Sequence, residues 1–147
     1  MPDRRTYPKR PIVGIGVVVW RQTRLLLIRR GHAPRKGQWS LPGGAQALGE
    51  TMAAAAAREV LEETSIRIAA PRLVDVIDSI ETDPRGRIRY HYTLIDFTAE
   101  WQAGELAAGS DAMDARWVEA AELGAYELWP ETVRIIALAA RLRPTGT

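Results

Sequence analysis

The hydrophobic positions in the first third of the chain form two short apolar runs separated by a short polar segment. Residues 12–20 (IVGIGVVVW) are rich in β-branched side chains and carry no charge, which predicts a strand buried on both faces. Residues 24–30 (RLLLIRR) predict a second strand, and the Gln-Thr pair between the runs predicts a tight turn that joins them as a hairpin. Residues 31–37 indicate a loop by their Gly and Pro content, and residues 38–42 (QWSLP) indicate a short extended segment ending at two glycines.

A helix and a second pair of strands are predicted next. Thr51 is a suitable N-cap for an alanine-rich helix that should run to about Thr64, because alanine is the strongest helix former and the segment lacks Pro and Gly. Residues 66–83 predict strand structure with an interruption at Pro71. The sequence DPRG at 83–86 has Pro and Gly where a type I turn favours them.

The last third of the chain completes a layered domain. Residues 87–101 place apolar side chains at every second position from Ile88 to Leu94, which predicts a long strand pairing back antiparallel. A loop over 102–114, a strand over 115–120 and an amphipathic helix over 129–143, with Pro130 in its first turn, are expected to follow. Strands around one central helix, closed by a second helix, predict a mixed α/β, or α+β, layered fold.

Composition adds limits to this picture. A chain of 147 residues, 46% hydrophobic and 26% charged, fits one globular domain over 12–143, with an extended or flexible arm over 1–11 and a short tail over 144–147. A net charge of +2 gives no reason to expect nucleic-acid binding. The absence of cysteine excludes disulfides and thiolate metal sites and favours a reducing cytoplasm. The apolar run at 12–20 is too short to span a membrane and has no small-residue cleavage site, so we interpret it as a strand.

Three carboxylates crowd the end of the predicted central helix. Glu59, Glu62 and Glu63 stand at i, i+3 and i+4, so they share one helical face and repel one another where the helix dipole also disfavours negative charge. Arg58 can offset one of these charges but not all three. Such a set predicts a hard divalent cation, Mg²⁺ or alternatively Mn²⁺, because oxygen ligands are present and His and Cys are absent nearby. The competing interpretation is an ordinary solvated acidic surface.

The residues before this helix favour the cation site, because they complete a longer pattern. The chain has Gly44, Glu50, the pair Arg58-Glu59, an apolar Val60, the pair Glu62-Glu63 and an apolar Ile66 at the spacing of the Nudix box, so it resembles the Nudix hydrolases, of the MutT and ADP-ribose pyrophosphatase kind. The resemblance covers about residues 12–142 and implies an α/β/α sandwich with a mixed sheet. One position departs from the box: Ser65 stands where the family has glycine, which should cost on the order of 1 kcal/mol in a left-handed conformation.

The resemblance also implies a metal site. It makes Gly44, through its backbone carbonyl, together with Glu50, Glu59, Glu62 and Glu63 the expected ligands of Mg²⁺. Arg58 should hold the carboxylates in place. The general base stays open between Asp111, Asp114, Glu62 and Glu63, and Asp111 is equally well explained as a residue that caps a turn.

Substrate contacts are predicted less sharply. Family members hydrolyse a diphosphate bond in a nucleoside diphosphate linked to another group, so the resemblance implies an ADP-ribose, nucleotide sugar or (d)NTP-like substrate. The candidate contacts are basic and aromatic side chains near the box, and each has a competing explanation as a solvated basic loop or a core aromatic: Arg29, Arg30, Arg35, Trp39 and Tyr92, with His32, Lys36, Tyr90 and Trp101 as further candidates. Trp117 and Trp129 are interpreted as core. A catalytically silent Nudix-fold nucleotide sensor is the alternative function, and the N-terminal arm is a candidate contact for a homodimer.

Overall fold

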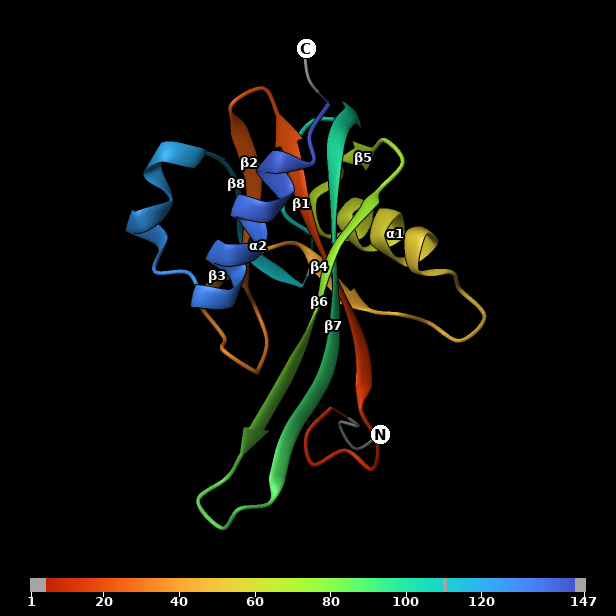
Figure 1. Ribbon diagram of the computed structural model, residues 1–147, viewed down its shortest axis with the longest axis vertical. Coiled ribbons are helices and arrows are strands. Elements are labelled where there is room, and N and C mark those ends of the chain that lie inside the picture. Colours follow the sequence, from red (N-terminus) through yellow and green to blue (C-terminus); the bar gives the residue numbers. More distant parts are fainter. Residues whose placement is uncertain (1–4, 110, 145–147) are drawn as a thin grey trace.

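A mixed β-sheet organises the fold (Figure 1), and the computed structural model describes residues 5–109 and 111–144. Within these residues the sheet has eight strands, ordered β3-β2-β1-β7-β5, with β4 on β1, β6 on β7 and β8 on β2. The strands are β1 (Ile12–Arg21), β2 (Arg24–Arg30), β3 (Trp39–Ser40), β4 (Gly43–Ala45), β5 (Arg67–Ile68), β6 (Arg72–Thr82), β7 (Ile88–Ala103) and β8 (Ala112–Glu119). The helices are α1 (Met52–Thr64), the 3₁₀ helix η1 (Ala120–Tyr126) and α2 (Pro130–Arg141).

The sheet confirms the predicted mixed α+β class. The expected hairpin is present, with Trp20 opposite Leu25, and β6 pairs antiparallel with β7 as the alternation predicted. The parallel pairing of β1 with β7 was not predicted; it runs from Ile12 opposite Tyr92 to Trp20 opposite Glu100. Because β1 is flanked on both edges and covered on both faces, its apolar run has no polar position, and Val17, Val18 and Val19 are fully buried.

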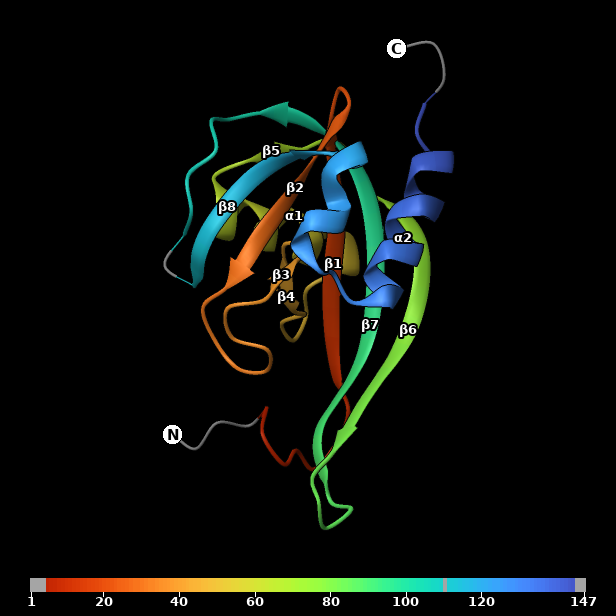
Figure 2. The same ribbon diagram turned by 90° about the vertical axis from the view of Figure 1, so that its left-hand side faces the viewer.

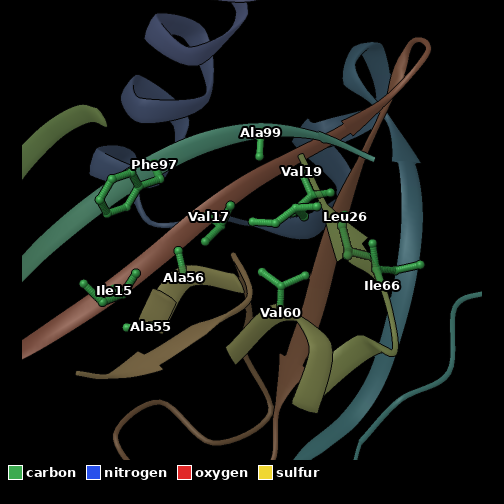
Figure 3. Packing of buried hydrophobic residues seen from close by; sticks show 11 residues of the cluster. Ile15, Val17, Val19, Leu26, Ala55, Ala56, Val60, Ile66, Phe97 and Ala99 are labelled. Atoms are coloured by element: carbon green, nitrogen blue, oxygen red, sulfur yellow. The ribbon is translucent and has the colours of Figure 1, made fainter. Parts of the chain in front are cut away.

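The two faces of the sheet carry two separate hydrophobic clusters. On one face α1 packs Ala55, Ala56 and Val60 against Ile15 and Val17 of β1 (Figure 3). On the other face α2 packs Ile135, Ile136 and Ala139 against Val18, Trp20 and Leu27 (Figure 2 shows the two helices on either side of the sheet). Only Ala55 and Ala56 of the five-alanine run are buried, so these small residues let α1 approach the sheet closely.

The distal halves of β6 and β7 project beyond the rest of the sheet, and the N-terminal segment lies beside them (Figures 1 and 2). The predicted turn at 83–86 is present, with Gly86 N–H donating to Asp83 O at 2.9 Å. The hydroxyl of Tyr7 donates to Asp83 Oδ2 at 2.8 Å, and the Arg87 guanidinium stacks 4.5 Å from the Tyr7 ring. The predicted arm over 1–11 and tail over 144–147 lie partly outside the described residues.

Several predicted boundaries need correction. The loop predicted over 102–114 is only the segment between β7 and β8, because β7 continues to Ala103 and β8 already begins at Ala112. Gly104, with φ of 101°, takes the left-handed conformation that ends β7. The helix η1 was not predicted, and α2 ends at Arg141, two residues early. No helix in the part of the chain that the structure describes is long and apolar enough to cross a membrane.

The helix α1 begins and ends as predicted. The Thr51 hydroxyl accepts a hydrogen bond from Ala54 N–H at 3.1 Å, which caps the N-terminus. At the other end Ser65 adopts φ of 64° and ψ of 13° and donates its N–H to Leu61 O at 2.9 Å. The departure from glycine therefore falls on a left-handed C-cap, where a β-carbon is unfavourable.

We expect Ser65→Gly to raise the free energy of unfolding by about 1 kcal/mol, because glycine adopts this left-handed conformation without steric cost. Thermal unfolding should show a rise in melting temperature of roughly 2–4 °C. The matched control is Ser65→Ala, which keeps the β-carbon and should give no gain. Equal melting temperatures for the glycine and alanine variants would contradict this account of the cap.

Candidate active site

A cavity of about 600 Å³ opens on the sheet face that α2 covers and reaches the acidic end of α1. Its floor includes Gly14 and Gly16 of β1 together with Tyr92, Leu94 and Asp96 of β7. Its walls come from the end of β2, the loop over 31–35, β3, β4, and Trp129 and Thr132 at the start of α2. The carboxylates Glu59, Glu62 and Glu63 line the same cavity, so the predicted cation site and the cavity are one site.

Arg58 organises the acidic end of the cavity. Its guanidinium donates to both carboxylate oxygens of Glu50, at 2.6 and 2.9 Å, to Glu59 Oε1 at 2.8 Å and to Glu62 Oε2 at 3.2 Å. It also donates to the carbonyl of Ala45 at 3.1 Å, which ties α1 to β4. The prediction that Arg58 holds the box carboxylates is consistent with this geometry.

Glu50 lies differently from the prediction. Both of its oxygens accept hydrogen bonds, Oε2 from Arg58 and Oε1 from Arg58 and from Ala47 N–H at 3.0 Å, and it does not line the cavity. The Arg58 guanidinium, ahead of the Ala47 N–H, lowers the pKa of Glu50 to about 2. In this structure Glu50 thus positions Arg58, and its predicted role as a metal ligand stays a prediction.

The carboxylate of Glu59 occupies the space beside Gly44 that a β-carbon would fill. A β-carbon built on Gly44 would overlap the carboxylate of Glu59, so that carboxylate lies directly against the backbone of β4. Burial raises the pKa of Glu59, and the neighbouring Arg58 only partly opposes this effect. The box glycine is therefore required here by close approach to Glu59, and its φ is not in the left-handed region.

Glu63 is the most strongly perturbed carboxylate at the site. Burial raises its pKa to about 8, against a hydrogen bond of 3.3 Å that its Oε2 accepts from Gly43 N–H. Glu59 and Asp111 add negative charge nearby, and Arg30 opposes them from across the cavity. A buried carboxylate with one weak hydrogen bond is costly to ionise, and a cation bound beside it would remove that cost.

The donor set fits a hard cation in its chemistry, although the carboxylates do not converge. Oxygen atoms of Glu59, Glu62 and Glu63 gather at one end of the cavity, as Mg²⁺ or Mn²⁺ prefers. As the side chains stand, no group of three or more His, Cys, Asp or Glu residues in 5–109 and 111–144 surrounds one point. The Glu62 side chain is 60% exposed and, like that of Glu59, forms an ion pair with Arg58.

Asp111 and Asp114, the predicted loop bases, occupy different places. Asp111 lines the cavity, and its Oδ1 lies 3.1 Å from His32 Nε2. Asp114 does not line the cavity, because its carboxylate binds Arg116 Nε at 3.1 Å and its own neighbour Ala115 N–H at 2.8 Å. Of the four candidate bases, Asp111, Glu62 and Glu63 line the cavity and Asp114 does not.

Only some of the predicted substrate contacts line the cavity. Arg30, Arg35, Trp39 and Tyr92 line the cavity, as do His32 and Tyr90. Arg29 does not, because it is exposed and its Nε donates to Gly37 O at 2.9 Å on the outside of the loop, and Lys36 is also absent from the lining. Trp101 lies elsewhere, with Arg21 stacked 3.9 Å from its ring. Arg29, Lys36 and Trp101 therefore lie outside the cavity lining, and their role as substrate contacts stays a prediction.

Two lining residues were missed by sequence reasoning. Trp129 was predicted to be core; it does pack against the cluster beneath α2, but it also lines the cavity, where Arg35 stacks 4.9 Å from its ring. Asp96 was not predicted to be a site residue. It lies on the same face of β7 as Tyr92 and Leu94, at a position where the alternating pattern predicts an apolar side chain. A charged residue at an inward strand position was the available signal.

Two curated proteins are similar to this chain in sequence. The chain is 37% identical over 109 residues to the ADP-ribose pyrophosphatase of Methanocaldococcus jannaschii, covering 74% of this chain and 62% of that protein. It is 33% identical over 109 residues to the ADPR responsive transcriptional repressor NtrR of Acinetobacter baylyi, covering 68% and 43%. The chain thus spans less than two thirds of the length of either curated relative.

A solved structure and a family model complete the comparison. The bifunctional NMN adenylyltransferase/ADP ribose pyrophosphatase of Francisella tularensis, complexed with AMP and a manganese ion, superposes with a TM-score of 0.70 at 27% identity, covering 90% of this chain and 42% of that one. The family model of the NUDIX domain matches residues 10–139. This match takes in the box, the sheet and the cavity, and the chain belongs to the Nudix hydrolase family.

Proposed function

We propose that this chain hydrolyses a diphosphate bond in a nucleoside diphosphate linked to another group, with Mg²⁺ as cofactor and Mn²⁺ as the alternative. ADP-ribose is the first candidate substrate, ahead of nucleotide sugars and (d)NTP-like compounds, since a relative is named for that activity. The proposal rests on one observation: three carboxylates line the same cavity as Arg30 and Arg35. Its volume of about 600 Å³ lies within the range for small-molecule sites.

The roles of the chain's own residues follow from their positions. Glu59, Glu62 and Glu63 would hold the cation, and the Gly44 carbonyl is the further expected ligand. When bound, the cation supplies charge neutralisation and Lewis acidity to the diphosphate. Arg30 and Arg35 bind phosphate oxygens of the substrate. Guanidinium groups suit this task because they stay charged even where burial lowers the pKa, as it does for Arg30.

Asp111 is the residue that we propose as general base. Hydrolysis breaks one P–O bond and forms another to water, so a group facing the cavity must accept the proton that the water loses. Asp111 faces the cavity with its Oδ1 3.1 Å from His32 Nε2, and among residues 5–109 and 111–144 it forms no ion pair with an arginine, whereas Glu62 accepts a hydrogen bond from Arg58. Glu63 is the remaining alternative.

The nucleotide sensor is the second candidate, because one relative is named as an ADP-ribose responsive repressor. This chain keeps every box carboxylate, and Arg58 arranges them against the backbone of β4. A sensor needs only to bind its nucleotide. In this cavity the acidic and basic walls would both face a bound diphosphate, an arrangement that suits cleavage of its bond. Turnover measurements separate the two functions directly.

A panel of nucleoside diphosphate derivatives with Mg²⁺ should show hydrolysis by the wild-type chain and a loss of at least about 10²-fold in kcat for Glu63→Gln, by analogy with the loss of other electrostatic groups. Phosphate release after phosphatase treatment measures both. Asp114→Asn is the matched control, since this carboxylate lies outside the cavity lining. Binding without turnover by the wild type would establish the sensor, and full activity of Glu63→Gln would remove Glu63 from the site.

Asp111→Asn should lower kcat by about 10²–10⁴-fold with little change in KM, because a general base acts in the transition state and not in binding. Steady-state kinetics with saturating Mg²⁺ test this expectation. If kcat is retained, the base is Glu63 and the Asp111 carboxylate serves the loop structure through His32.

The metal-free chain should lose stability as pH rises from about 4.5 to about 8, the ordinary and the folded-state pKa of Glu63. In this window the folded state holds a proton that the unfolded state releases, so each rise in pH favours unfolding. Chemical denaturation in chelator should show that Glu63→Gln removes much of this slope. Glu50→Gln is the control, because the lowered pKa of Glu50 acts only as pH falls from 4.5 toward 2. An unchanged slope in Glu63→Gln would contradict the raised pKa.

A further inference from the structure

A second carboxylate site lies in the same cavity, away from the acidic helix. Asp96 is only 7% exposed, yet it lines the cavity from the β7 side of the floor. The charges that act on it are those of Asp75 and Arg134 and not those of the α1 carboxylates. Asp96 therefore lines the floor of the cavity opposite Gly16 of β1, on a different element from the α1 carboxylates that would hold a cation.

Asp96 has no hydrogen-bond partner among residues 5–109 and 111–144. Arg134 is the nearest source of positive charge, but it donates to Asp75 Oδ2 at 2.9 Å and to Glu131 Oε2 at 2.9 and 3.2 Å. Buried polar groups are almost always paired, because leaving one unpaired costs folding free energy. No side-chain oxygen of the described residues is both fully shielded and unpaired, so the Asp96 carboxylate opens into the cavity, where a bound ligand can supply its partner.

The backbone of β1 makes room for this carboxylate. Gly16 stands opposite Asp96 in the parallel pairing, and a β-carbon on Gly16 would overlap Asp96 Oδ1. Two apolar side chains lie beside it: Leu41 Cδ1 is 4.0 Å from the same β-carbon position, and Leu94 precedes Asp96 on the same strand face. A ligand group that fits here has apolar faces and a hydrogen-bond donor at its edge.

We propose that Asp96 is a specificity residue that accepts a hydrogen bond from the exocyclic amino group of an adenine base, with the diphosphate extending from there to the acidic end of α1. The inference rests on the proposed function, because it takes the ligand to be a nucleotide. A planar base satisfies the apolar walls and the single buried acceptor together. A sugar presents hydroxyls around its ring and needs more polar partners than this end of the floor offers.

The protonation state of Asp96 agrees with an acceptor role. Burial, ahead of the charge of Asp75, raises the pKa of Asp96 to about 6. At neutral pH the carboxylate is mostly ionised, and an ionised carboxylate only accepts hydrogen bonds. The group that it recognises must then be a donor, as an amino group is.

The test compares AMP with purine riboside 5′-monophosphate, which differs from AMP only by loss of the 6-amino group. Calorimetry of the wild-type chain should give at least about tenfold tighter binding of AMP, because a site built around a donor rejects the analogue that lacks it. Asp96→Ala should bring the two affinities close to equality, chiefly by weakening AMP. Asp96→Asn keeps a carbonyl acceptor and should restore most of the preference.

Asp78→Ala is the matched control, because Asp78 is an exposed carboxylate on the neighbouring strand β6 that does not line the cavity, and this variant should keep the wild-type preference. Melting temperatures measured without ligand confirm that each variant folds. Equal loss of both ligands in Asp96→Ala would make Asp96 structural and overturn the proposal, as would absence of AMP binding to the wild type. If Asp96→Ala lost a preference for AMP over 2′-deoxy-AMP but kept the preference for AMP over the purine analogue, Asp96 would bind a ribose hydroxyl. That result would also overturn the proposal.

These outcomes are distinct from failure of the proposed function. AMP that binds through Asp96 to a chain without turnover would leave the base site standing and remove the hydrolase. Turnover of ADP-ribose with no Asp96-dependent preference would do the reverse.

Discussion

The guanidinium of Arg58 is the interaction on which the acidic end of the cavity depends. It joins the segment before α1 through Glu50, the strand β4 through Ala45 O, and α1 itself through Glu59. Three like charges at the end of a helix would otherwise spread into solvent to reduce their repulsion. Arg58 does not neutralise them, since the pKa of Glu59 stays raised beside it and only that of Glu50 is lowered, to about 2. It fixes the geometry and leaves net negative charge for a cation.

The second constraint is close packing of a carboxylate against a glycine, which occurs at two places in the fold. The carboxylate of Glu59 lies against Gly44, and that of Asp96 lies against Gly16, each in space that any side chain would fill. These glycines are next to each other in the sheet, because Gly43 pairs with Gly16 and Gly44 with Ile15. The short strand β4 therefore brings both carboxylate positions to the same part of β1.

The sequence predicted what local spacing determines. The helix with its Thr51 cap, the left-handed Ser65 and the Arg58 contact with Glu62 all depend on residues within a few positions of one another. The parallel pairing of β1 with β7 and the role of Asp96 depend on residues about 80 positions apart, which no periodicity connects. The same holds for Glu50. Its spacing in the box could be read from the sequence, but its hydrogen bonds with Arg58 follow from the tertiary structure.

The two ends of the cavity therefore differ in how freely they can change. The cation end is set by helical spacing, so moving one of Glu59, Glu62 or Glu63 by a single residue turns it about 100° away from the shared face. The floor is set by strand positions on β1 and β7 and by the start of α2, where a side chain can change without disturbing that helical face. Chemistry that resides in α1 and recognition that resides in the sheet can then vary independently. This separation explains why the box identifies a reaction class while the substrate has to be inferred from residues outside it, such as Asp96 and Trp129.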